Sequence, residues 1–153
     1  MLVKDVMTFG AEEIGPAESI LAAARKMREM GVGALVVREE GRVLGLITDR
    51  DIVVRSTAEG AAPGEMEVQR AMTPQVLDCQ EYEELEDAVT RMERGAVRRL
   101  LVVNDDRDPV GMLSVDDIAL ASPALAGEIV EHVRAPERPI QRGAWSWWET
   151  PEP

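Results

Sequence analysis

The spacing of apolar residues predicts helices and strands that alternate along the chain. A short strand around Glu12–Ile14 precedes a helix, because the next apolar residues recur at the spacing of one helical face: Ile20, Ala23, Ala24, Met27 and Met30. Ala34–Arg38 and Val43–Thr48 are apolar and rich in β-branched residues, and the turn Glu39–Gly41 separates them, which predicts a β-hairpin. A second helix is expected to begin at Asp49–Arg55.

The same order of elements returns about 65 residues later, so the chain contains an internal repeat. Val6-Met7-Thr8 returns as Ala71-Met72-Thr73, and Gly45–Ile52 returns as Gly111–Ile118. The offset rises to 66 after the first helix, which we interpret as one residue inserted near Arg98-Arg99. A unit of this size buries its apolar face poorly alone. We therefore expect the two copies to pack as a pseudo-twofold pair within one two-lobed module.

In the second repeat the pattern predicts a helix near Glu84–Arg94 and hairpin strands near Leu100–Asn104 and Val110–Ser114. The predicted fold class is α/β (α+β), with two βαββα repeats. A further helix is predicted from its apolar positions, Leu125, Ile129 and Val133. We divide the chain into a first repeat (1–60), a linker (61–67), a second repeat (68–122), a C-terminal helix (123–134) and a tail with tryptophan and proline that we expect to be flexible (135–153).

Composition narrows the possible functions. The net charge of −12 disfavours binding to nucleic acid or to an anionic membrane surface, because both need a basic footprint. No stretch of 18 apolar residues and no signal sequence are present, so a cytoplasmic protein is expected. Cys79 and His132 are the only residues of their types, which argues against a disulfide, a metal centre and a nucleophile–base pair. We therefore expect no catalytic residues and no enzymatic activity.

Each repeat ends its hairpin with a hydroxyl residue that an aspartate follows three positions later: Thr48 with Asp51, and Ser114 with Asp117. This spacing is typical of a helix capping box, which is sufficient to explain it. The same geometry also suits a ligand, because a helix N-terminus favours phosphate and a carboxylate can accept bonds from both hydroxyls of a ribose. Capping boxes usually have glutamate or glutamine at this position, so aspartate in both repeats favours the ligand-binding interpretation over a simple helix cap.

Two adjacent arginines, Arg98 and Arg99, precede the first hairpin strand of the second repeat. Paired guanidinium groups can clamp a phosphate. The alternative is that both arginines are solvated and form weak ion pairs with nearby acids such as Glu93. The aligned positions of the first repeat carry no charge, so the two sites are not expected to be equivalent. Asp116 adds a second negative charge beside Asp117, which disfavours phosphate there.

Three segments carry a resemblance to a known family: the opening Asp5–Thr8, the Gly-Val-Gly-Ala-Leu-Val-Val strand and the closing Gly45–Ile52, with counterparts in the second copy. Over residues 1–122 the chain resembles a tandem cystathionine-β-synthase (CBS) domain pair, or Bateman module, of the small stand-alone bacterial type. The resemblance implies two packed βαββα units with ligand clefts between them. It also implies a disc-shaped dimer and a sensor of adenosine-containing ligands such as AMP, ADP, ATP, NAD or S-adenosylmethionine.

The resemblance also implies residue roles. Asp51 and Asp117 would hold ribose, while Thr48 and Ser114 would face phosphate, with Arg50 beside the first pair. One adenine slot, served by Asp117, would be lined by Val32, Gly33 and Ala34. The other, served by Asp51, would be lined by Val97–Leu100, with Arg98 and Arg99 reaching the phosphates.

The sequence thus predicts a non-enzymatic adenine-nucleotide-binding module that reports to an unidentified protein effector. The alternative is a ligand-free dimeric interaction scaffold. We expect a homodimer through the two repeat helices, on the assumption that part of their apolar faces stays exposed. The tail contains Trp145, Trp147 and Trp148, which could dock on the module, bridge the dimer or bind another protein.

Overall fold

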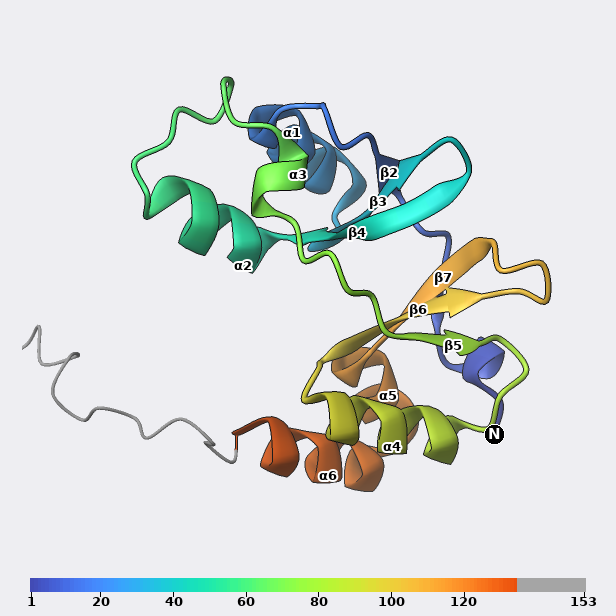
Figure 1. Cartoon of the computed structure of the whole chain (residues 1–153). Coiled ribbons are helices and arrows are strands. Elements are labelled where there is room, and N and C mark those ends of the chain that lie inside the picture. Colours follow the sequence, from blue (N-terminus) through green and yellow to red (C-terminus); the bar gives the residue numbers. More distant parts are fainter. Residues whose placement is uncertain (135–153) are drawn as a thin grey trace, which may run out of the picture.

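The computed structural model describes residues 1–134, which form two halves that each combine a small β-sheet with helices (Figure 1). Mixed helix and strand content with two sheets confirms the predicted fold class. In chain order the elements are the 3₁₀ turn η1 (Val3–Asp5), β1 (Thr8–Phe9), β2 (Glu13–Ile14), α1 (Ile20–Met30), β3 (Ala34–Glu39), β4 (Arg42–Thr48), α2 (Asp49–Ile52), the π-helical turn η2 (Val53–Thr57), α3 (Val68–Ala71), β5 (Asp78–Gln80), α4 (Leu85–Gly95), β6 (Arg99–Val103), β7 (Pro109–Ser114), α5 (Val115–Ala121) and α6 (Pro123–Arg134).

The two sheets have the same core topology. One has the order β2-β3-β4 and the other the order β1-β7-β6-β5. In each, a short strand runs parallel to the first strand of an antiparallel hairpin: β2 beside β3, and β5 beside β6. The hairpin residues Val36, Leu101 and Val103 form a small buried cluster that joins the two halves. The sheets therefore face each other across an apolar contact.

Helices α1 and α4 bury their apolar faces inside their own halves. Ser19 caps α1 by accepting a hydrogen bond from the Ala22 backbone N–H at 3.1 Å. Gly31 ends that helix in the left-handed conformation, at φ +67°. Met30, in the last turn next to Gly31, is 50% exposed, so the predicted apolar face is wrong at its final position. The other apolar positions are buried or partly buried, including Ile20 and Met27.

The apolar faces that were expected to stay exposed for a dimer are therefore buried or partly buried apart from Met30, while the dimer itself stays a prediction. In α1, Ile20 and Ala23 are fully buried and Met27 is 7% exposed. In α4, the apolar residues Leu85, Ala88, Val89 and Met92 are 0–3% exposed. The sheet of each half and the opening segment of the other repeat cover these two helix faces.

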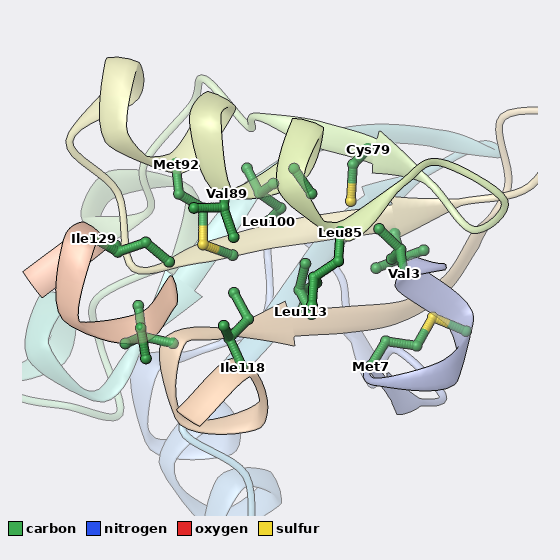
Figure 2. Close-up of a cluster of buried hydrophobic side chains, with 14 residues drawn as sticks. Val3, Met7, Cys79, Leu85, Val89, Met92, Leu100, Leu113, Ile118 and Ile129 are labelled. Atoms are coloured by element: carbon green, nitrogen blue, oxygen red, sulfur yellow. The ribbon is translucent and has the colours of Figure 1, made fainter. Parts of the chain in front are cut away.

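The opening segment of each repeat packs on the other half. Val3 and Met7 lie in the core of the second half, as Figure 2 shows, and β1 pairs with β7. Conversely, Val68 and Ala71 of α3 lie in the core of the first half. The folded halves thus differ from the sequence repeats, since each half takes its opening segment from the other copy.

A glycine in each closing motif makes this crossing possible. A Cβ atom on Gly111 would lie 2.5 Å from the backbone oxygen of Thr8, and one on Gly45 would lie 2.5 Å from that of Thr73. Real Cβ atoms do not approach a backbone oxygen so closely, so both positions require glycine. Next to Gly45, Leu46 and Thr73 exchange backbone hydrogen bonds of 3.0 and 2.8 Å.

The single inserted residue lies elsewhere than the sequence suggested. Val37 pairs with Gly45, and Val102 pairs with Gly111, so Val102 is the structural counterpart of Val37. The offset of 65 therefore continues through the strand, and the extra residue lies in the hairpin turn around 104–108. Runs of similar apolar residues hide such a shift, whereas a surface turn accommodates an insertion without disturbing the strand pairing.

Helix α6 breaks the symmetry of the pair. It contacts α4 and α5, and it contributes Ala126 and Ile129 to the core of the second half. Ile129 is fully buried at the edge of that cluster (Figure 2). The helix predicted from Leu125, Ile129 and Val133 is therefore present as a cover on one half. The predicted tail, 135–153, lies outside the described residues.

The glycine requirement predicts opposite effects at two positions. Gly111→Ala should lower the free energy of unfolding by about 1–3 kcal/mol, because its methyl group collides with the crossing backbone. Gly127→Ala, in α6, meets nothing within 4 Å and should raise that free energy by roughly 0.5–1 kcal/mol through helix propensity. Urea denaturation of both variants measures this. Equal stability of Gly111→Ala and the wild type would contradict the role of the crossing.

Candidate functional site: a cleft between the halves

The two hydroxyl–aspartate motifs both form capping boxes. Asp51 N–H donates to Thr48 Oγ1 at 3.1 Å, and Thr48 N–H donates to Asp51 Oδ2 at 3.0 Å. Asp117 N–H likewise donates to Ser114 Oγ at 3.2 Å, and Ser114 N–H donates to Asp117 Oδ2 at 2.8 Å. The capping interpretation is therefore confirmed for α2 and α5. Capping leaves carboxylate oxygens available, so it does not exclude a ligand.

One of the two motifs lies in a cleft between the halves. The cleft has a volume of about 250 Å³, a little below the usual range for small-molecule sites, and it is open to solvent. The second half contributes the start of α5 and the adjoining strands, and the first half contributes the turn between α1 and β3. Its lining residues are Thr8, Gly10, Glu12, Gly31, Val32, Gly33, Ala34, Arg99, Met112, Ser114 and Asp117.

The cleft brings together five residues that the resemblance had grouped in one site: Val32, Gly33, Ala34, Ser114 and Asp117. They come from opposite repeats and lie about 80 residues apart in the sequence. The packing of the two halves is what places them side by side. Their role in holding a ligand stays a prediction.

Sequence reasoning missed the contribution of the crossing segment. Thr8, Gly10 and Glu12 line the cleft, although they precede the first helix of the other repeat. Thr8 had one available signal, because the Met-Thr dipeptide occurs at the start of both repeats. Its position could not be inferred, since it depends on β1 pairing with β7 of the second half.

Thr8 already contacts the candidate ribose-binding carboxylate. Thr8 Oγ1 donates to Asp117 Oδ1 at 3.0 Å, while Ser114 Oγ donates to Asp117 Oδ2 at 2.5 Å. Asp117 therefore has protein donors on both oxygens. A carboxylate can accept about four hydrogen bonds, so Oδ1 retains capacity for a further donor. These contacts hold the carboxylate in one orientation at the cleft.

The charge in the cleft comes from three side chains. Arg99 lines it together with the acids Glu12 and Asp117. A Cβ atom on Gly33 would lie 3.5 Å from an Arg99 nitrogen and 3.1 Å from Asp49 Oδ2, so a further carboxylate borders the site. The resemblance assigned Arg99 to the site of Asp51, whereas the structure has it in the cleft of Asp117. Acids outnumber the single guanidinium there, and one of them, Glu12, also has Lys26 Nζ 3.8 Å from its Oε2.

The residues expected at the second site, around Asp51, lie in different parts of the structure. Arg98 lines a different cavity, next to α6, with Val115 and Val133 among its neighbours. Arg50 is exposed, and its backbone N–H donates to Asp49 Oδ1 at 2.8 Å. Thr48 and Asp51 are half-buried at the start of α2, and Val97 packs at the edge of the core of the second half. A ligand role for Asp51 stays a prediction.

The other residues with reactive side chains lie outside the cleft. Cys79 is fully buried, and this burial raises the pKa of its thiol to about 12. His132 is exposed on α6, where a hydrogen bond to the Glu128 carbonyl and the charge of Glu93 raise the pKa of its imidazole. Within residues 1–134, no group of three or more His, Cys, Asp or Glu side chains is arranged to hold a metal ion. No helix of that part is long and apolar enough to cross a membrane.

Comparisons with known proteins agree with this architecture. The CBS domain family profile matches residues 3–56 and 67–124. The CBS domain-containing protein YhcV of Bacillus subtilis is 36% identical over 118 residues, which are 77% of this chain and 83% of YhcV. Protein MK0525 of Methanopyrus kandleri is 33% identical over 120 residues, which are 78% of this chain but only 61% of that protein. This chain thus matches less than two thirds of MK0525.

A solved structure shows the same fold with ligands. The CBS domain pair of protein MJ0100, in complex with 5′-methylthioadenosine and S-adenosyl-L-methionine, matches with a TM-score of 0.70 and 25% identity. The match covers 79% of this chain and 94% of that one.

Proposed function

The chain belongs to the CBS domain family as a tandem pair, a type of regulatory module, and from this premise we propose that it is a non-enzymatic sensor of an adenosine-containing ligand. The ligand binds in the cleft of Asp117. One observation supports the proposal: Val32–Ala34 of the first half, which the resemblance assigns to an adenine slot, lie in the same cavity as the capped carboxylate of the second half.

Each part of the cleft suits a part of an adenosine. The backbone and small side chains of Val32–Ala34 offer a narrow apolar wall for the flat base. Asp117, held by Thr8 and Ser114, offers carboxylate oxygen to a ribose hydroxyl through a charge-assisted bond. The related pair of MJ0100 binds 5′-methylthioadenosine and S-adenosyl-L-methionine, which contain this nucleoside. This supports the same ligand class here.

The charge of the cleft favours ligands with few phosphates. Glu12 is partly offset by Lys26, whose Nζ lies 3.8 Å from Glu12 Oε2, so Asp117 and the bordering Asp49 remain beside one guanidinium, that of Arg99. A triphosphate would bring several negative charges towards these carboxylates, which costs free energy in a partly desolvated site. Adenosine, AMP and the positively charged S-adenosylmethionine avoid most of this repulsion. We therefore rank them above ATP as ligands.

The first functional prediction compares the two capped aspartates. Asp117→Asn should weaken binding of AMP or S-adenosylmethionine by about 1.5–3 kcal/mol, roughly 10- to 150-fold, because it removes a charged acceptor. Asp51→Asn alters the same type of cap on α2, so it is the matched control for stability. Isothermal titration calorimetry of both variants measures the affinities. No binding of any adenosine ligand to the wild type would favour the scaffold alternative.

The second prediction concerns Arg99. Arg99→Ala should lower the affinity for AMP more than the affinity for adenosine, because the guanidinium contacts only the phosphate-bearing ligand. The difference between the two losses isolates the phosphate interaction from any change in packing. Competition calorimetry with both ligands measures it. Equal losses for adenosine and AMP would mean that Arg99 acts by supporting the wall of the cleft.

We retain the homodimer as part of the proposal, on a corrected surface. With α1 and α4 buried, the large exposed apolar residues of the closing helices become the candidates. Val53 and Val54 of η2 are 59% and 48% exposed, and Leu120 of α5 is 91% exposed. Isolated leucines are common on surfaces, but these residues occupy equivalent helices of the two repeats. A twofold contact through those helices would cover them together.

This surface can be tested with charged substitutions. Light scattering at micromolar concentration should give twice the 16.8 kDa chain mass for the wild type. Leu120→Asp should shift the mass towards that of one chain, because the carboxylate loses its hydration in a dimer contact. Met30→Asp is the control, since Met30 is the exposed residue of the face first considered. Dissociation by Met30→Asp alone would return the interface to α1.

A further inference from the structure

A small apolar cavity lies beside the C-terminal half of α6. Its volume is about 120 Å³, and it lies between the start of β6, the start of α5 and α6. Its lining consists of four aliphatic side chains and one charged side chain: Val115, Ile129, Val130, Val133 and Arg98. We call it the α6 cavity. Ile129 and Val115 are 0% and 5% exposed, so they form its floor, whereas Val130 and Val133 are half-buried at its sides.

The size and chemistry of the α6 cavity suit one large aromatic side chain. Its volume is well below the range for ligand sites, and about half that of the cleft between the repeats. Aliphatic walls gain free energy when an apolar group displaces their water. Arg98 is exposed at the same cavity, and a guanidinium stacks well on an indole ring. The cavity therefore favours a tryptophan over a nucleotide.

The same chain carries such side chains close by. All three tryptophans of the sequence, Trp145, Trp147 and Trp148, follow α6 within the last 19 residues. Val133 of the cavity is adjacent to Arg134, where α6 ends. The eleven residues from there to Trp145 can span up to about 36–40 Å, so reach is not limiting. Covalent attachment also gives the segment a millimolar effective concentration, which allows even a weak contact to form.

We propose that the tryptophan segment 145–148 of the same chain docks in the α6 cavity, with one indole ring against Arg98. Docking covers the apolar side of α6 and places the tail against the half that contains the cleft. It also occupies Arg98, so this guanidinium is not free for a phosphate. The proposal does not depend on which ligand the cleft binds, because it concerns a separate cavity.

Tryptophan fluorescence of the full chain tests this directly, since every tryptophan lies in the tail. The native emission should be shifted to shorter wavelength relative to the urea-unfolded protein, with weaker quenching by acrylamide. Val133→Asp and Arg98→Ala should each move the emission and the quenching towards the unfolded values. Ala124→Asp adds the same charge to the exposed first turn of α6, and Arg94→Ala removes an exposed arginine from α4. Both controls should leave the spectrum unchanged.

Two results would overturn the proposal. One is native emission and quenching equal to those of the unfolded chain, which would show that the tryptophans are solvated. The other is a shift that disappears on dilution as the protein becomes monomeric by light scattering, which would show that a second copy provides the contact. Far-ultraviolet circular dichroism confirms that each variant is folded. A concentration-independent shift that Val133→Asp and Arg98→Ala abolish, with both controls unchanged, supports docking within one chain.

Discussion

The close approach of two backbones at Gly111 and Gly45 is the constraint on which the rest of the structure depends. At each point a strand of one half lies against the opening segment of the other repeat, too close for any Cβ atom. Because the opening segment of the first repeat crosses over, Val3 and Met7 pack in the core of the second half. Each half would lack part of its core without it, so the two repeats fold as one unit.

The crossing also builds the candidate site. Pairing of β1 with β7 puts Thr8 beside Asp117, where its hydroxyl fixes one carboxylate oxygen. The chain then continues past Glu12 along the edge of the cleft. The segment that interlocks the halves is thus the same segment that lines the candidate cleft.

Departures from twofold symmetry give the two halves different chemistry. Arg99 extends into the cleft of Asp117, while the structurally aligned position of the first half is Ala34, which has no charge. Helix α6 covers the second half, and its cavity with Arg98 has no counterpart in the sequence of the first repeat. The second half therefore contributes both to the cleft at Asp117 and to the separate α6 cavity.

The sequence by itself determined the elements, the repeat and the fold class. Helical spacing, the hairpin turns and the Thr48–Asp51 and Ser114–Asp117 caps are local signals, since each depends on residues a few positions apart. Val32–Ala34 and Asp117, which the family resemblance grouped, line the same cleft, while their role stays a prediction. Which surfaces are buried was not accessible in this way. The faces of α1 and α4 looked available for a dimer because nothing local shows that the other repeat completes the core.

Only the tertiary structure decided how the repeats exchange their opening segments and where Arg99 points. Both outcomes depend on contacts between residues far apart in the sequence, such as Thr8 with Asp117 and Gly33 with Arg99. Periodicity within one window carries no information about such pairs. The side of a strand is set by alternation, but the cavity that a long side chain enters is set by the neighbouring half. For this protein the sequence specified the parts, and packing between the repeats specified the site.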